Sequence, residues 1–298
     1  MRSAGPPRSA APRSAGRRAV LLAPALAVVV VLFGGGLAEA VAQSLGRRPF
    51  LPPRPLGLDA YRELLADPAV RAAVGTTLRV ALLSTGLAVA VGVAAALVVR
   101  RLGRTRRWFA GLLQVTLPVP HVVAALAMLL LLSQTGVLSR LAAGAGLVDA
   151  PAAFPELTQD AFGWGVVASY VWKEAPFVGV VALAALTGGV AEREDAARVL
   201  GATASQRLRH VVLPALAPSV AAAGVLVFAF TVGSYEVPFL LGRPFPTTLS
   251  VVAYQRFRDP DLDARPVAMA VCVVLAALVG LCAAVYLALA DRSARSRR

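Results

Sequence analysis

Three side chains that could exchange protons or bind ions stand inside long apolar stretches of this chain. Lys173 and Glu174 are adjacent in one stretch, and His121 follows two prolines in another. An unpaired ion at the centre of a bilayer costs about 2.5–3.5 kcal/mol on insertion scales, so each of them needs a partner. A paired acid and base could catalyse a reaction within the membrane, but no recognisable catalytic motif surrounds them. The alternatives are pairing with a neighbouring helix and, for Glu174, a place on a solute pathway.

Other polar residues stand near the ends of the apolar stretches. Tyr235 and Glu236 lie near the outer end of one stretch, where they either line a pathway or are solvated as a helix end. Arg79 is expected to extend its guanidinium to the interface, and His121 to be a hydrogen-bonded residue at a kink rather than a ligand. No Cys/His cluster has metal-ligand spacing, so we expect no metal site.

The elements that position these residues are membrane helices. The 298 residues are 58% hydrophobic and 15% charged, with a mean hydropathy of +0.71, whereas soluble domains carry roughly 25% charged residues. A helix needs about 20 apolar residues to cross a bilayer, because lipid offers the backbone no hydrogen-bond partner. The sequence therefore predicts an all-α polytopic membrane protein with about six transmembrane helices, near 20–41, 74–99, 109–132, 162–186, 215–241 and 267–290.

The formal net charge of +14 is distributed as a membrane topology signal. The basic residues, of which all but Lys173 are arginine, fall in short clusters between the apolar stretches and form no aromatic-basic platform for nucleic acid. One side of the predicted topology holds 18 arginines, in 1–18, 100–107, 193–209 and 291–298, against ten on the other. The richer side is expected to be cytoplasmic, which places both termini in the cytoplasm.

These patterns predict four regions along the chain. Residues 1–18 read as a disordered basic tail, 19–71 as the first transmembrane helix with an external loop, 72–290 as the main transmembrane domain, and 291–298 as a cytoplasmic tail. The first apolar stretch could instead be a secretory signal cleaved after a small-x-small site near 40–42. We expect it to be retained as a helix.

One polar loop, 188–214, is longer than a connection between two helices requires. Residues 190–200 predict a short helix, and Gly201 would stop it with a left-handed cap. Thr203 or Ser205 could cap a second short helix, and Pro214 stands where the next span begins. The loop is therefore expected to form a helix-Gly-helix element that offers a docking surface on the cytoplasmic side, with His210 at that interface or solvated.

This loop resembles the signature of the membrane subunits of binding-protein-dependent ABC importers, which is Glu-Ala-Ala, three residues, Gly, nine residues, then Ile-x-Leu-Pro. Both spacings are kept here, with Asp in place of Glu and Val in place of Ile; the matching residues are Asp195, Ala196, Ala197, Gly201, Val211, Leu213 and Pro214. The resemblance implies a type I ABC importer permease fold. It also implies a coupling loop that contacts an ATPase subunit through Asp195, Ala196, Ala197, Gly201, Ala202, Leu213 and Pro214.

The same resemblance implies the partners of the chain: ATPase subunits that use the ATP, an extracytoplasmic solute-binding protein, a second permease subunit, related or identical, and membrane lipid. The sole lysine lies between Trp172 and Glu174, so the chain holds no P-loop, and we expect it to bind no cofactor of its own. The run Gly233 to Gly242 resembles the spermidine/putrescine branch, which implies a polyamine or another small solute, with Glu174, Tyr235 and Glu236 as candidates for the pathway. The alternative is a secondary transporter, which normally shows two related halves, and no internal repeat is visible.

Overall fold

The computed structural model describes residues 13–49, 55–102 and 105–295, and the regular structure in these ranges is helical. The first half comprises α1 (Arg13–Val28), a π-helical turn (Val29–Gly34), α2 (Gly35–Ser44), α3 (Asp59–Ala66), α4 (Pro68–Val99), α5 (Arg106–Val115), α6 (His121–Leu132) and α7 (Val137–Gly144). The second half comprises α8 (Trp164–Ala185), α9 (Val190–Val199), α10 (Ala204–Arg207), a π-helical turn (Leu208–Val212), α11 (Leu213–Gly233), α12 (Glu236–Leu241), α13 (Leu249–Phe257) and α14 (Arg265–Arg295). Short 3-10 turns occur at Pro151–Ala153 and Leu262–Ala264.

Six helical stretches in the described part of the chain are long and apolar enough to cross a membrane, which agrees with the predicted number. They are Val20–Ser44, Pro68–Val99, His121–Gly144, Trp164–Ala185, Ala204–Gly233 and Leu262–Ala290. The stretch of greatest burial is Trp164–Ala185, which forms the centre of the bundle.

Two of the predicted spans have the wrong limits. The stretch 109–132 is not one helix, because the chain leaves helical geometry between α5 and α6, where Pro118 and Pro120 supply no N–H and disfavour helix before them. The stretch 215–241 is interrupted after Gly233, where Ser234 is extended with φ −70° and ψ 136°. The residues after this turn form the separate short helix α12.

The predicted tails are also shorter than expected. Helix α1 begins at Arg13, so the prediction of disorder is wrong for 13–18, where alanine and arginine favour continuation of the helix outward from the apolar stretch. Residues 1–12 lie outside the described residues. At the other end α14 continues to Arg295, beyond the predicted limit of 290, and 296–298 lie outside the described residues.

Helices α4 and α8 pack closely because small residues line their contact. Ser84, Ala88, Gly92 and Ala96 recur every fourth residue of α4 and therefore share one face. A Cβ on Gly92 would lie 2.5 Å from the carbonyl oxygen of Ala175 on α8. Small residues allow this approach of two backbones, which is how helices gain van der Waals contact inside a membrane.

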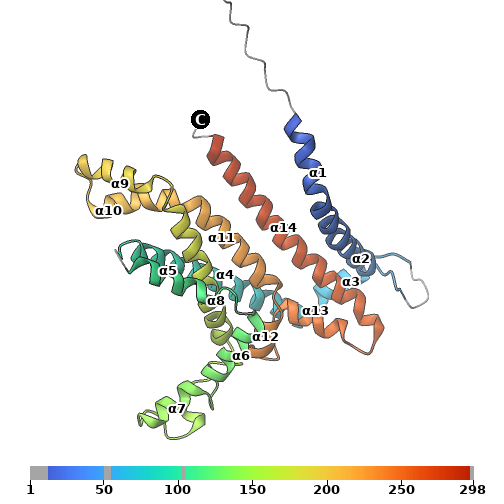
Figure 1. The fold of residues 1–298 in the computed structure, drawn as a ribbon. Coiled ribbons are helices and arrows are strands. Elements are labelled where there is room, and N and C mark those ends of the chain that lie inside the picture. Colours follow the sequence, from blue (N-terminus) through green and yellow to red (C-terminus); the bar gives the residue numbers. More distant parts are fainter. Residues whose placement is uncertain (1–12, 50–54, 103–104, 296–298) are drawn as a thin grey trace, which may run out of the picture.

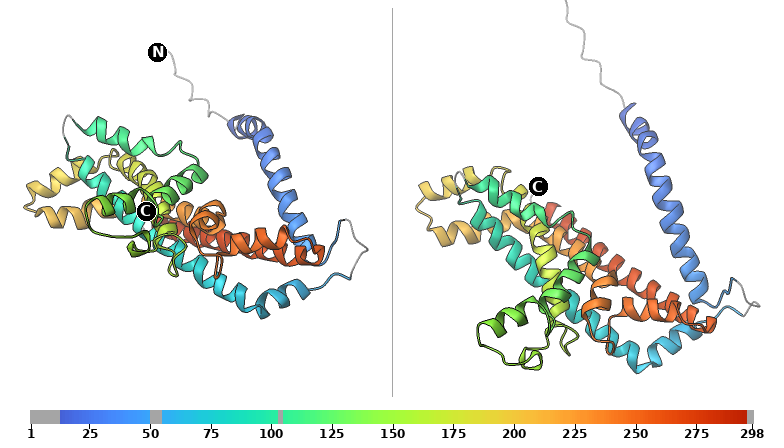
Figure 2. Two further views of the ribbon diagram at one scale, coloured as in Figure 1. Left: turned by 90° about the horizontal axis from the view of Figure 1, so that it is seen from below. Right: turned by 60° about the horizontal axis from the view of Figure 1, so that its bottom comes forward.

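Helix α1 stands apart from the bundle over most of its length, and α2 joins it to α14 (Figures 1 and 2). Its apolar side chains are accordingly exposed, Val20 at 73% and Leu21 at 70%. A bilayer would cover such a surface.

The start of α1, the end of α14 and the α9–α10 pair lie at one end of the molecule, in the upper part of Figure 1. Helices α3, α7 and α13 lie toward the opposite end. The described parts of three of the four segments that are richer in arginine, 1–18, 193–209 and 291–298, thus lie at one end.

Candidate functional site

The α9–α10 hairpin, defined here as Val190–Arg207, has the predicted helix-Gly-helix form. Gly189 and Gly201 bound α9 with φ angles of +71° and +83°, in the left-handed region that favours glycine. Thr203 then caps α10: its Oγ1 accepts the N–H of Gln206 at 3.3 Å, and its own N–H donates to Gln206 Oε1 at 2.8 Å. This reciprocal capping box satisfies amide groups that the helix itself leaves unpaired.

The predicted ATPase contacts fall in two places. Asp195, Ala196 and Gly201 are exposed on the hairpin, where Asp195 pairs with Arg198 at 3.3 Å, and Ala197 and Ala202 are half-buried. Leu213 and Pro214 belong instead to the first turn of α11, beyond the π-helical turn, and are exposed.

Two further residues of the hairpin are the most exposed large apolar side chains of the described chain. Val199 is 88% exposed and Leu200 is 87% exposed, both directly before Gly201 at the tip of the hairpin. Sequence reasoning missed them, although two apolar residues ending a polar helix are a recognisable signal. An apolar tip at the end of a polar element indicates a surface for a protein partner.

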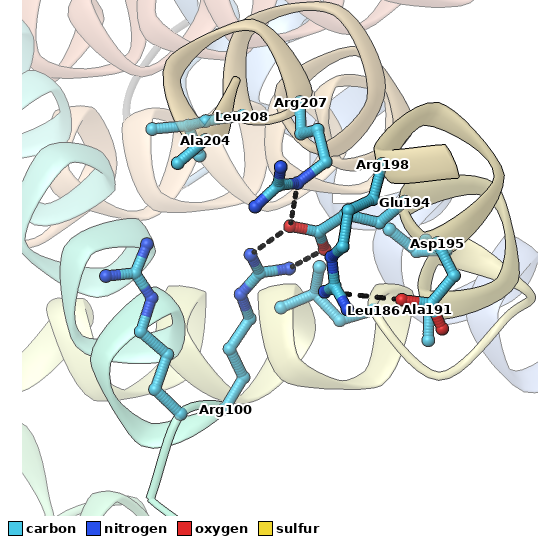
Figure 3. A pocket seen from close by; sticks show the side chains of 11 residues that line it. Arg100, Leu186, Ala191, Glu194, Asp195, Arg198, Ala204, Arg207 and Leu208 are labelled. Carbon is cyan, nitrogen blue, oxygen red and sulfur yellow. Dashed lines mark hydrogen bonds and ion pairs between the residues drawn. The ribbon is translucent and has the colours of Figure 1, made fainter. Parts of the chain in front are cut away.

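A hollow of about 520 Å³ separates the hairpin from the end of α4, and Figure 3 shows the side chains that line it. Glu194 points into it and pairs with Arg100 at 3.2 and 3.3 Å and with Arg207 at 3.8 Å. These three side chains are 17–19% exposed. The sequence did not single out Glu194, because its partner Arg100 lies 94 residues away.

The polar residues inside the membrane stretches meet at the break between α5 and α6. His121 Nε2 lies 2.8 Å from Glu174 Oε1, and Lys173 Nζ donates to the carbonyl oxygen of Leu117 at 3.1 Å. Lys173 is 5% exposed and Glu174 is 9% exposed. Irregular backbone at membrane depth needs such partners, so the geometry supports the pairing of Glu174 with a neighbouring helix. His121 also stacks on Phe230 at 4.2 Å between ring centroids.

Tyr235 lines a second hollow, of about 310 Å³, between α11, α13 and α14, and Glu236 is the next residue along the chain. Tyr235 is 4.3 Å from Tyr254 and 5.0 Å from Phe239 between ring centroids. Phe257 lines the same hollow, and Glu236 is exposed and accepts a hydrogen bond from Ser234 Oγ at 3.3 Å. Aromatic faces next to a carboxylate can bind a cation.

The hydroxyl of Tyr235 is held in its neutral form. Desolvation, then the neighbouring Tyr254 and Glu236, raise the pKa of Tyr235 above its ordinary value. The group therefore stays a hydrogen-bond donor throughout the neutral pH range.

The two remaining candidates have local contacts. Arg79 stacks on Phe162, with the guanidinium carbon 4.9 Å from the ring centroid. His210 Nδ1 lies 3.0 Å from the carbonyl oxygen of Gln206 and is exposed.

Comparison with known proteins identifies the family. Residues 88–296 match the model of the binding-protein-dependent transport system inner membrane component, and the chain belongs to this family. It is 31% identical over 219 residues to a probable molybdenum ABC transporter permease protein of Haloferax volcanii, covering 73% of this chain and 74% of the relative.

Two further relatives are named for molybdenum and for putrescine. The molybdenum transport system permease protein ModB of Mycobacterium tuberculosis is 34% identical over 227 residues, 73% of this chain and 80% of ModB. The putrescine transport system permease protein PotI of Escherichia coli K12 is 28% identical over 209 residues, 68% of this chain and 69% of PotI.

The fold has solved counterparts. A bacterial ABC transporter involved in the import of the acidic polysaccharide alginate has a chain with a TM-score of 0.73 and 21% identity, covering 93% of this chain and 96% of that one. The same transporter has been solved in complex with an alginate pentasaccharide-bound periplasmic protein. The protein is thus a multi-pass membrane permease subunit of an ABC importer, with the type I fold that the sequence predicted.

Proposed function

We propose that this permease subunit is driven by separate ATPase subunits that dock on the α9–α10 hairpin. The observation that carries the proposal is the tip at Val199 and Leu200, whose apolar side chains are almost fully exposed beside the left-handed turn at Gly201. ATP-driven closure of the ATPase pair would rotate two permease subunits between inward and outward openings. A solute-binding protein would deliver the solute from outside, in keeping with the complex solved for the alginate transporter.

The docking is tested by purifying the complex through a tag on this subunit. ATPase subunits should co-purify and hydrolyse Mg-ATP with the unsubstituted protein. Replacing both tip residues by serine should release the ATPase subunits. Serine at the exposed Leu147, in the segment between α7 and α8, should leave them bound. Equal recovery from the tip variant would contradict docking at the hairpin.

The solute is proposed to be a small organic cation of the polyamine class. Support comes from the aromatic hollow lined by Tyr235, from the exposed acid Glu236 that follows Tyr235 in the chain, and from the similarity to a putrescine permease. Replacing Glu236 by glutamine removes the charge and keeps the shape, so uptake of spermidine into proteoliposomes containing the full complex should fall about tenfold, as for loss of one charged contact. The conservative variant Glu236→Asp should retain more uptake.

A second candidate solute is a molybdate-type oxyanion, because two relatives are molybdenum permeases at 31% and 34% identity. Calorimetric titration of the partner solute-binding protein with spermidine and with molybdate separates the two. Binding of molybdate alone would make the cation proposal wrong.

A further inference from the structure

The acid that joins the hairpin to the membrane helices is Glu194, one position before the acid of the family signature. Asp195 is 65% exposed and pairs only within its own helix, with Arg198. Glu194 is 19% exposed and turns toward Arg100, which caps the C-terminus of α4 (Figure 3). The adjacent acids of α9 therefore have different neighbours, one outside the hairpin and one within it.

The Glu194–Arg100 contact has directional geometry. Both guanidinium Nη atoms of Arg100 face the two carboxylate oxygens, at 3.2 and 3.3 Å. Such a forked pair fixes orientation as well as distance, which a lysine would not do. Partial burial reduces its screening by salt. Arg207 approaches the same carboxylate from α10, so one acid holds both helices of the hairpin.

The N-terminal part of helix α4 is also held by hydrogen bonds to a neighbouring helix. Asp67 caps its N-terminus by accepting the N–H of Ala69 at 2.8 Å, and also accepts from Arg256 of α13 at 2.8 Å. Thr77 Oγ1 of α4 accepts the N–H of Leu249, the first residue of α13, at 2.8 Å. The 32 residues of α4 span about 48 Å and link the hairpin to α13.

We propose that Glu194 is a positioning residue that locks the α9–α10 hairpin to α4, so that movement of the hairpin is passed along α4 to α13 and the aromatic hollow. The inference rests on the proposed function, in which the ATPase supplies the movement. A packed helix with fixed ends transmits displacement as a rigid body. Loss of the Glu194–Arg100 contact would leave the hairpin free to move without α4.

The test measures the distance between hairpin and α4 in the complete complex. Cys272 and Cys282 are replaced by alanine, and spin labels are attached at Val98→Cys on α4 and Glu192→Cys on α9, both exposed positions. Pulsed EPR is recorded without nucleotide and after trapping with ATP and vanadate. With Glu194 intact, one narrow distance distribution is expected in both states. With Glu194→Gln, the distribution should broaden or gain a second peak in the trapped state.

Matched variants distinguish loss of the Glu194–Arg100 contact from general destabilisation of the protein. Arg100→Gln removes the other half of the contact and should broaden the distribution equally. Arg198→Gln breaks an ion pair that lies within α9 and should leave it narrow. A narrow trapped-state distribution in Glu194→Gln or Arg100→Gln would overturn the inference, whereas failure of ATPase subunits to co-purify with the protein that keeps Glu194 would contradict the proposed function instead.

Discussion

Gly201 illustrates how one backbone angle determines the form of the hairpin. Its φ of +83° belongs to the region where a side chain is unfavourable, and the N–H groups of Gly201 and Ala202 bond back to Arg198 and Ala197 at 3.0 Å. Among the described residues, no atom lies within 4 Å of the position that a Cβ would occupy, so there only the backbone angle resists a substitution. Any steric clash would therefore come from a partner.

Gly201→Val should strain the turn by about 1–2 kcal/mol, since β-branched residues are disfavoured there. The variant should insert into the membrane at the normal level, yet lose co-purified ATPase or the link between hydrolysis and uptake. Gly201→Asn is the matched control, because asparagine tolerates this conformation better than other residues. Normal recovery and normal coupling with valine would mean that the loop is only a connector.

At the scale of elements, the contact between α4 and α8 depends on the absence of side chains. A Cβ on Gly92 would meet Ala175 O at 2.5 Å and Val178 Cβ at 2.7 Å, so neither backbone nor side chain can give way easily. This contact lies about two helical turns from the end of α4 that faces the hairpin. It therefore holds α4 against the centre of the bundle.

Gly92→Val should destabilise the protein by about 1–3 kcal/mol through overpacking, measured as a lower thermal unfolding temperature in detergent. Gly86→Val is the control: it lies in the same helix, is exposed, and has no atom within 4 Å of its Cβ position. Equal unfolding temperatures for the two variants would contradict the close approach of α4 and α8.

The break between α5 and α6 depends on a hydrogen bond from Lys173 of α8 to the carbonyl oxygen of Leu117. Lys173→Met removes the donor that satisfies the Leu117 carbonyl, so the variant should lose about 1–3 kcal/mol. Thermal unfolding measures the loss, with the half-exposed neighbour Trp172→Phe as control. A methionine variant as stable as the control would show that the carbonyl finds another partner.

The sequence predicted those features that depend on local pattern. The lengths of the apolar stretches predicted the number of transmembrane helices. The positions of the glycine and threonine residues predicted the hairpin at 190–207. The pattern around Pro118 and Pro120 predicts only a kink, because the residues on either side are as apolar as those of a continuous helix. The partners of Lys173, Glu174 and Glu194 could not be predicted, since contacts between residues 53 to 94 positions apart depend on how the helices pack.

At the scale of the whole molecule, the first and last described helices approach the end of the bundle where the hairpin lies. The start of α1, the end of α14 and the α9–α10 hairpin share one end of the bundle (Figure 1). In the topology that the sequence predicts, the segments on the cytoplasmic side hold 18 arginines against ten on the other. Arginine-rich segments are retained in the cytoplasm during insertion. The proposed ATPase contact requires the same orientation, because ATP is hydrolysed in the cytoplasm.

Both termini are therefore predicted to be cytoplasmic. A fluorescent protein that folds only in the cytoplasm, fused after Arg298, should be bright, and the same reporter inserted after Gly146 should be dark. Gly146 suits the insertion because it lies in an exposed turn between α7 and α8, with open space around it. The expected contrast follows from the charge asymmetry, so adding arginines beside Gly146 should weaken it. A dark C-terminal fusion with a bright insertion would reverse the topology, and the hairpin would then face away from any ATPase.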